Sequence, residues 1–364
     1  MFNPSRLTHA RVRRGLSKKR LAEMSAVSLR SLHQYESGDV VPSAPVLDAL
    51  SQTLRFPHDF FSRETLEVPE PNAVTFRALT SMTGAKRGAT LVAGAIAVEL
   101  FRWIEERFTL PAVDVPESMG LGPEACAEMV RESWGLGTGP VRNVLHALEF
   151  NGVRICSLPE EHAEVDAFSL WRDSTPYVFL NTLKSGERGR FDAAHELGHL
   201  VMHRGVLPDA RDREVEAQRF AAAFLMPRSS LSVARGLPTL DRLVELKGRW
   251  GVSVAALAHR LYEVGYVSEW TYRMLCIQIS QAGYRKKEPR PMARESSQIL
   301  EKVLRSLRSK GKSRRDVAAA LGLTPDELSA FVFNLAMTTI DGGAAGVSDG
   351  VRLPELTIVE GGLR

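Results

Sequence analysis

The sequence predicts a mainly α-helical protein with an α+β centre: an all-α head, a centre that contains one small sheet, and a helical C-terminal extension. Three observations lead to this prediction. Apolar residues recur at helical spacing through 5–66 and again through 240–340. Short β-prone runs occur between 152 and 181. With 364 residues, 44% of them hydrophobic and 25% charged, the chain is long enough for two or three globular domains.

The head is predicted to contain a helix-turn-helix. Ser17 and Ser28 each stand just before a helical run, as N-cap residues do. A helix over 18–25 is followed by a short turn at 26–27 and by a second helix over 28–36. A helix of that length can enter the major groove of DNA.

The second of these helices carries the residues expected to touch bases. Leu32 and Tyr35 would face the core. The expected outward-facing residues are Leu29, Arg30, Ser31 and Gln34. Arginine and glutamine can form paired hydrogen bonds with guanine and adenine edges. The expected phosphate contacts are Arg11, Arg13, Arg14, Lys18, Lys19 and Arg20. A helical bundle that binds protein instead of DNA is the alternative.

Residues 67–117 are predicted to form a linker and a connecting helix, because prolines and glycines precede an apolar run over about 90–108. The domain that follows is expected over 118–236. Its β-prone runs are 153–156, 167–171 and 177–180. Its expected helices are 123–134, 140–151, 188–204 and 212–225. Gly-Pro pairs at the start of the first two place proline in a first turn.

The remaining chain is predicted to be a helical C-terminal domain over 237–340 and a glycine-rich, poorly ordered tail over 341–364. Thr324, Pro325 and Glu327 form the pattern of a capping box at the start of one of these helices.

The string His195-Glu196-Leu197-Gly198-His199 is the most informative in the chain. On a helix, His195 and His199 share one face with Cβ atoms about 5–6 Å apart, so that both imidazoles can bind one Zn²⁺ ion. Glu196 is offset around the helix and can act on a zinc-bound water as a general base. Gly198 would allow another backbone, such as that of a substrate, to approach closely.

A third zinc ligand has three candidates: His203, Glu214 and Glu216. His203 would lie roughly 12 Å along the helix axis from His195, too far to share the ion. The two glutamates point about 200° apart on the next helix, so only one can face the metal. Glu214 shares its face of the helix with the small residues Ala217 and Ala221, which would let this face lie close to the histidines and favours Glu214 as the ligand. The face that carries Glu216 also looks partly buried.

These residues lie in a stretch, 143–227, that resembles the ImmA/IrrE-type zinc metallopeptidases. The matching strings are RNVLHALEFNGVRI, PYVFLN, GRFDAAHELGHLVMH and EVEAQRFAAAFLMP. The resemblance implies a gluzincin-like endopeptidase whose zinc is held by His195, His199 and Glu214, with Glu196 as the catalytic base. Gln218 stands where the family commonly has asparagine.

The N-terminal residues resemble the XRE/Cro-type helix-turn-helix, on the string RRGLSKKRLAEMSAVSLRSLHQYESGDVVPSAPVLDALSQTLRFPHDFF. Double-stranded DNA is therefore the expected partner of residues 1–66. The region 240–340 looks like the helical extension that accompanies such fusions.

Taken together, the sequence predicts a regulatory zinc-dependent endopeptidase that hydrolyses a peptide bond in a repressor-like protein. The strand 177–180 is expected to pair with an extended substrate, and Tyr177 and His162 are candidates for stabilising the oxyanion. One alternative is a DNA-binding transcriptional regulator whose zinc site senses metal or ligand without proteolysis. Another is an interaction protein of the toxin–antitoxin type.

A cytoplasmic location, no membrane partner and a homodimer complete the expectations. The first residues lack a signal-peptide pattern, and the most apolar stretch is too short to span a bilayer. The three cysteines lie far apart, which suits a reducing compartment. A net charge of +4 is compatible with a nucleic-acid partner.

Overall fold

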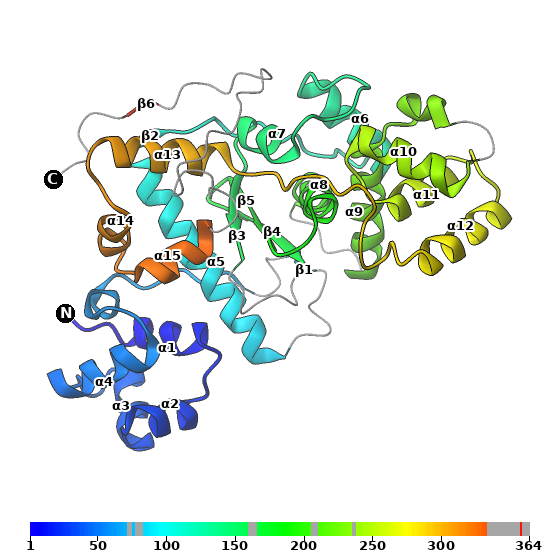
Figure 1. Cartoon of the computed structure of the whole chain (residues 1–364). Coiled ribbons are helices and arrows are strands. Elements are labelled where there is room, and N and C mark those ends of the chain that lie inside the picture. Colours follow the sequence, from blue (N-terminus) through cyan, green and yellow to red (C-terminus); the bar gives the residue numbers. More distant parts are fainter. Residues whose placement is uncertain are drawn as a thin grey trace.

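Helices surround one four-stranded sheet, and the head lies at one end of the molecule (Figure 1). The computed structural model describes residues 1–70, 75–76, 83–158, 166–204, 210–234, 238–332 and 357–358. The mainly α-helical architecture with an α+β centre is confirmed. Among the described helices, none is both long and apolar enough to cross a membrane.

The head consists of helices α1 (Pro4–Arg13), α2 (Lys18–Ser25), α3 (Leu29–Ser37) and α4 (Ala44–Leu54), followed by a 3₁₀ turn at His58–Ser62. Ser17 and Ser28 cap α2 and α3, as predicted: each side chain accepts a hydrogen bond from the first-turn backbone. Ala26 ends α2 in the left-handed conformation, with φ 56°, and turns the chain into α3. Leu32 and Tyr35 are buried, as expected.

The central sheet has the strand order β1-β4-β5-β3. Its strands are β1 (Thr75–Phe76), β3 (Arg154–Ser157), β4 (Ala167–Arg172) and β5 (Thr175–Leu180). A tight turn at Asp173 and Ser174, both with positive φ, joins β4 to its antiparallel neighbour β5. Strand β3 runs parallel to β5 on the other side. The three predicted runs therefore form this sheet, with β1 added from the region expected to be a linker.

Two helices pack on opposite faces of the sheet. Helix α5 (Gly84–Glu105) brings Gly94 against the rings of Phe168 and Phe179, which stack 4.2 Å apart. Helix α8 (Gly186–Met202) lies on the other face, where Trp171 donates a hydrogen bond to the Leu200 carbonyl at 3.1 Å. Helix α5 is thus part of the buried core of the central domain, and not merely a connection.

Three further helices of the centre are α6 (Pro123–Ser133), α7 (Val144–Phe150) and α9 (Ala210–Leu225). Pro123 occupies the first turn of α6, as predicted. The helix expected over 140–151 instead begins at Val144, because the Asn143 side chain caps it by accepting from the His146 N–H at 2.9 Å. Pro140 therefore precedes this helix.

The C-terminal helices are α10 (Leu240–Trp250), α11 (Val254–Glu263), α12 (Glu269–Gln281), α13 (Gln298–Ser309), α14 (Arg314–Ala320) and α15 (Pro325–Val332). Helices α10 to α12 lie at the end of the molecule beyond α9, whereas α13 to α15 return to the sheet and the head (Figure 1). The capping box is only half formed, because Thr324 accepts from the Glu327 N–H at 3.2 Å while the Glu327 side chain turns to the head.

Most of the tail expected to be poorly ordered lies outside the described residues. Its described part, β6 (Thr357–Ile358), pairs antiparallel with β2 (Phe108–Thr109) in a second small sheet that the sequence did not predict.

Candidate metal centre and DNA-binding surface

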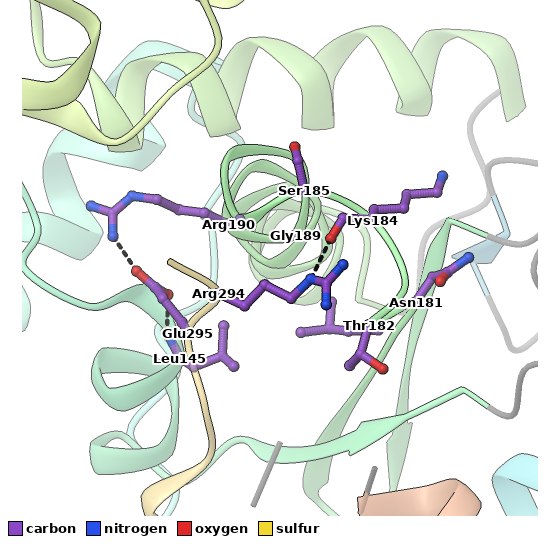
Figure 2. Close-up of a pocket in the computed structure, with 11 residues that line it drawn as sticks. Leu145, Asn181, Thr182, Lys184, Ser185, Gly189, Arg190, Arg294 and Glu295 are labelled. Carbon is purple, nitrogen blue, oxygen red and sulfur yellow. Dashed lines mark hydrogen bonds and ion pairs between the residues drawn. The ribbon is translucent and has the colours of Figure 1, made fainter. Parts of the chain in front are cut away.

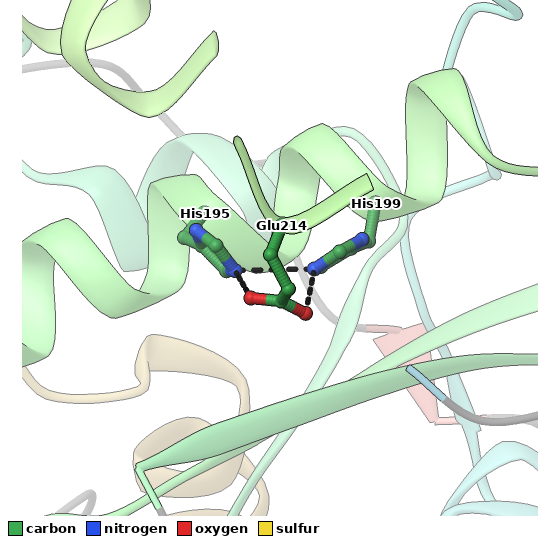
Figure 3. Close-up of side chains that lie close together, drawn as sticks. All are labelled: His195, His199 and Glu214. Atoms are coloured by element: carbon green, nitrogen blue, oxygen red, sulfur yellow. Dashed lines mark hydrogen bonds and ion pairs between the residues drawn. The ribbon is translucent and has the colours of Figure 1, made fainter. Parts of the chain in front are cut away.

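Two histidines of α8 and one glutamate of α9 converge on a single point (Figure 3). The Nε2 atoms of His195 and His199 lie 3.1 Å apart. The two carboxylate oxygens of Glu214 lie 3.2 Å from Nε2 of His195 and 3.3 Å from Nε2 of His199. Both histidines are buried, and Glu214 is partly exposed. Three metal-ligating atoms from two helices thus face one another.

These distances fit a metal of the size and geometry of Zn²⁺. Ligands at 2.0–2.1 Å from a tetrahedral ion are separated from one another by about 3.3 Å. The three donor separations of 3.1, 3.2 and 3.3 Å match this edge length. Two imidazoles and one carboxylate also leave the fourth position of a tetrahedron open, as a catalytic site requires.

The charge state of the donors suits metal binding. Burial lowers the pKa of His199, which favours the neutral imidazole. Burial alone would raise the pKa of Glu214, but the hydrogen bonds with His195 and His199 hold that pKa well below its usual value. The site therefore presents a neutral imidazole at His199 and an ionised carboxylate at Glu214, the protonation states in which these side chains ligate a metal.

Glu196 is held in place by the sheet. It is buried, and its Oε2 accepts a hydrogen bond from Oγ of Ser169 on β4 at 2.7 Å. It does not belong to the converging set of metal-ligating atoms, so its carboxylate is separate from theirs. Ser169 was not singled out from the sequence. The available signal was one hydroxyl residue at the centre of the apolar strand Ala167–Arg172.

A chain of polar contacts extends from His199 to the surface. Nδ1 of His199 lies 2.9 Å from Nδ1 of His203, whose Nε2 lies 3.0 Å from Oε2 of Glu216. If Nε2 of His199 ligates a metal, its Nδ1 must carry the proton and donate it to His203. His203 is then protonated on Nε2 and donates to Glu216. Each residue therefore fixes the tautomer of the next.

The start of α8 is fixed by the segment that precedes α13 (Figure 2). Arg190 forms an ion pair with Glu295, whose other oxygen accepts from the Val144 N–H at 2.9 Å. Arg294 donates to the Lys184 carbonyl at 2.7 Å. Gly186 leaves no room for a Cβ atom, which would lie 2.7 Å from the Met292 carbonyl. These contacts fix the helix that carries both histidines.

Four expectations about substrate contacts are wrong or lie outside the described residues. Strand β5 is flanked on both sides by β4 and β3, so it has no free edge for an added strand. Tyr177 packs beside Phe101 of α5, on the sheet face opposite α8, and cannot reach an oxyanion at the metal. His162 lies outside the described residues. The space beside Gly198 is filled by Phe220 of α9, and not by a substrate backbone.

The residues expected to contact bases differ in their exposure. Leu29 and Arg30 of α3 are exposed, whereas Ser31 and Gln34 are half-buried. Helices α2 and α3 lie on the side of the head that points away from the rest of the molecule (Figure 1).

Half of the cations expected to contact phosphates are used inside the protein. Arg11 pairs with Glu36 at 2.5 Å. Arg13 and Arg14 both pair with Glu327 of α15 at 2.8 Å. The sequence pattern could not show this, because Glu327 is more than 300 positions away. The cations left with substantial exposure are Lys18, Lys19 and Arg20.

Comparison with known families agrees with this arrangement. Residues 149–262 match the IrrE N-terminal-like domain, a peptidase family, and residues 5–60 match a helix-turn-helix domain. No curated protein matches the chain. The chain therefore combines a helix-turn-helix head with an IrrE-type peptidase domain, and both resemblances found in the sequence are confirmed. The family implies a metal, and the cluster of His195, His199 and Glu214 is able to bind one.

Proposed function

Given a helix-turn-helix head and an IrrE-type peptidase domain in one chain, we propose that the protein is a regulatory zinc-dependent endopeptidase that cleaves a repressor-like protein. The observation that carries this proposal is the convergence of two imidazole nitrogens and one carboxylate beside a separate buried carboxylate, Glu196. A site that only stored or sensed metal would have no use for that additional base.

The roles of the residues follow from their positions. His195, His199 and Glu214 would hold the ion, and Glu196 would accept the proton of the attacking water and pass it to the leaving amine. A bound Zn²⁺ ion supplies a Lewis acid that polarises the scissile carbonyl and acidifies water. The hydrogen bond from Ser169 keeps one oxygen of Glu196 oriented, so that the other can take the proton. His203 and Glu216 would orient His199.

The head supports the choice of a repressor-like substrate, because a DNA-binding module brings the peptidase close to other proteins bound to the same DNA. Leu29, Arg30, Ser31 and Gln34 are proposed to contact bases. Two copies on a palindromic operator would read half-sites one helical turn apart, so a homodimer on DNA is part of the proposal.

Glu196→Gln tests the proposed chemistry. Zinc-loaded wild type is incubated with the repressors encoded by neighbouring genes, and a discrete fragment is expected. The variant should retain the wild-type zinc content and give no fragment, because it removes the base and not a ligand. Loss of zinc from the variant would make Glu196 a ligand and overturn the mechanism. Zinc-dependent DNA binding with no cleavage of any repressor would favour the sensor alternative.

The proposed DNA contacts are tested by Arg30→Ala and Gln34→Ala in the full chain. Each should reduce base discrimination by about 1–3 kcal/mol, because paired hydrogen bonds to a base edge are lost. Binding is measured to an operator selected from random duplexes and to a scrambled duplex. Lys19→Ala is the control and should weaken both equally, as a phosphate contact does. Equal losses on both duplexes for Arg30→Ala would show that it does not read bases.

A further inference from the structure

A cleft of about 710 Å³ opens beside the metal centre. Its walls come from the start of α8, from α9, from the start of α11 and from the segment 284–288 that follows α12. This volume lies within the roughly 300–1,000 Å³ that ligand sites usually occupy. Two of its walls therefore belong to the helical extension, to which the sequence alone assigned no function.

The cleft continues the metal site along both of the helices that carry ligands. Phe191 lies four residues before His195 on the same face of α8, and it lines the cleft. Gln218 and Ala222 follow Glu214 at four and eight residues on the same face of α9, and they also line it. The cleft thus begins about one helical turn, roughly 5–6 Å, from the ligands. A peptide bound at the metal would extend into it.

Gln218 provides a polar contact on this path. Its Oε1 is buried and has no hydrogen-bond partner among the described residues. A buried acceptor without a partner is costly, and the N–H groups of an extended peptide are suitable donors. The position of this amide between the metal and the far end of the cleft therefore favours a peptide as the occupant.

The acidic and the basic side chains that line the cleft differ in whether they have ion-pair partners. Asp166 pairs with Lys184 and with Arg188. Glu187 and Glu288 both pair with the buried Lys247, at 2.7 and 3.3 Å. Every carboxylate of the lining is therefore already paired.

Arg285 and Lys286, by contrast, are exposed at the cleft and have no carboxylate partner within the described parts of the chain. They also lie beyond residues 149–262, the part of the chain that matches the peptidase family.

On the basis of the peptidase function proposed above, we propose that this cleft receives the substrate segment on one side of the scissile bond, and that Arg285 and Lys286 select acidic side chains in that segment. The helical extension is then the part of the protein that determines substrate specificity. Exposed ion pairs contribute little affinity each, so their main effect is to discriminate between substrates of opposite charge.

The test uses full-length Glu196→Gln protein loaded with zinc, so that bound peptides are not cleaved. The probes are two pools of 12-residue peptides with amidated C-termini and random sequence, identical except that one contains Asp and Glu where the other contains Lys and Arg. Binding is measured by affinity selection and mass spectrometry. The acidic pool should bind roughly three- to tenfold more tightly, as two exposed ion pairs allow. Arg285→Glu/Lys286→Glu should abolish or reverse this preference.

A matched control separates the cleft from the head, which also attracts anions. Lys19→Glu/Arg30→Glu makes the same change in charge on the exposed face of the head and should leave the peptide preference intact. Loss of the preference in this control, with none in the cleft variant, would place acidic-peptide binding on the head and overturn the inference. Equal binding of both pools to the parent protein would also overturn it.

The proposed function is tested separately by digestion of the same pools with protein that retains Glu196. Cleavage without enrichment of acidic residues near the cut would contradict the specificity inference and leave the peptidase function standing. A charge preference in binding that depends on Arg285 and Lys286, with no cleavage of any pool or repressor, would support the cleft and contradict the peptidase function.

Discussion

At the scale of single residues, the candidate site depends on which of three histidines each of two glutamates of α9 contacts. Glu214 contacts both His195 and His199, whereas Glu216 contacts His203. His203 is the C-cap residue of α8 and lies outside its regular turns. The geometry thus supports Glu214 as the third ligand and gives Glu216 an indirect role through His203.

Zinc affinity should separate these two roles. Glu214→Ala removes a ligand and should abolish stoichiometric zinc binding. Glu216→Ala should weaken zinc binding by about 10- to 100-fold, the usual effect of losing a group that orients a ligating histidine. Affinities are measured by competition with a chelating dye, with the exposed neighbour Val215→Ala as the control. A larger loss in Glu216→Ala than in Glu214→Ala would move the ligand to Glu216.

The residue scale also shows what spacing in a sequence can and cannot predict. The contact of His195 with His199 follows from a separation of four on one helix, so the motif alone predicted it. The bond between Ser169 and Glu196 depends on how β4 lies across α8. The pairing of Arg13 with Glu327 depends on how the two ends of the chain dock. No local pattern encodes either contact.

At the scale of elements, the ligand set depends on the close approach of α8 and α9. A Cβ atom on Gly198 would lie 3.0 Å from Cδ1 of Phe220 and 3.2 Å from its Cβ, so the glycine allows the ring to pack directly against α8. Ala217 and Ala221 on α9 are fully buried, as the predicted stripe of small residues requires. The distance from Glu214 to the histidines is therefore set by small residues in this interface.

Gly198→Ala should push the two helices apart. We expect a loss of about 1–3 kcal/mol in the free energy of unfolding, the usual cost of overpacking, together with weaker zinc binding. Gly189→Ala, on the same helix, is the matched control, because a Cβ there meets nothing within 4 Å. That control should be neutral or stabilise the protein by about 0.5–1 kcal/mol. Similar urea midpoints and zinc affinities for the two variants would contradict the packing argument.

Helices α7 and α13 are joined by a buried carboxylate with an unusual titration. Glu149 of α7 accepts hydrogen bonds from the Ser297 hydroxyl and from the Gln298 N–H at the start of α13. Burial outweighs these bonds and raises the pKa of Glu149 from 4.5 to about 7. Between these values the folded protein holds a proton that the unfolded chain releases. The contribution of protonated Glu149 to the free energy of unfolding is therefore complete below pH 4.5 and is lost as the pH rises to 7.

Compared with Glu149→Gln, the wild type should lose about 3 kcal/mol of unfolding free energy between pH 4.5 and pH 8, because each unit of pKa difference corresponds to about 1.4 kcal/mol. Urea unfolding across this range measures the difference. Glu128→Gln, an exposed position on α6, is the control and should follow the wild type. Parallel pH profiles for the wild type and Glu149→Gln would show that Glu149 is ionised in the fold.

The elements that the sequence predicted are those with strong local signals, namely the capped helices of the head and the three β-prone runs. Helix α5 was expected only as a connection, because its apolar residues do not reveal that two phenylalanines of the sheet pack against Gly94. Strands β1, β2 and β6 have two residues each and are stabilised by distant partners. Pairing of this kind leaves no periodicity in the sequence.

At the scale of the whole molecule, the head is attached to the body through α1. Arg6 pairs with Glu99 of α5, and Arg13 and Arg14 share Glu327 of α15. Helix α15 also reaches the sheet, where Oγ of Ser157 on β3 donates to the Ala330 carbonyl at 2.6 Å. One short helix thus contacts both the DNA-binding head and the sheet of the peptidase domain.

Glu327→Ala should therefore loosen the head without affecting the metal centre. Arg13 is 1% exposed and Glu327 is 4% exposed, so the substitution leaves a buried arginine without its carboxylate, at a cost of about 3–5 kcal/mol. We expect calorimetry to show a separate, earlier unfolding transition for the head and hydrogen exchange to accelerate in α1. Zinc content should not change, because His195, His199 and Glu214 do not contact Glu327.

Glu301→Ala is the matched control for this substitution, because it breaks an ion pair with the exposed Arg305 on neighbouring α13 and should cost less than about 1 kcal/mol. If Glu327→Ala unfolds in one transition at the wild-type temperature, the buried pairs do not hold the head to the body. If zinc is lost together with the head, the two domains form a single cooperative unit. The attachment of the head would then influence the metal centre through the contact of α15 with β3. DNA binding and metal binding would be coupled.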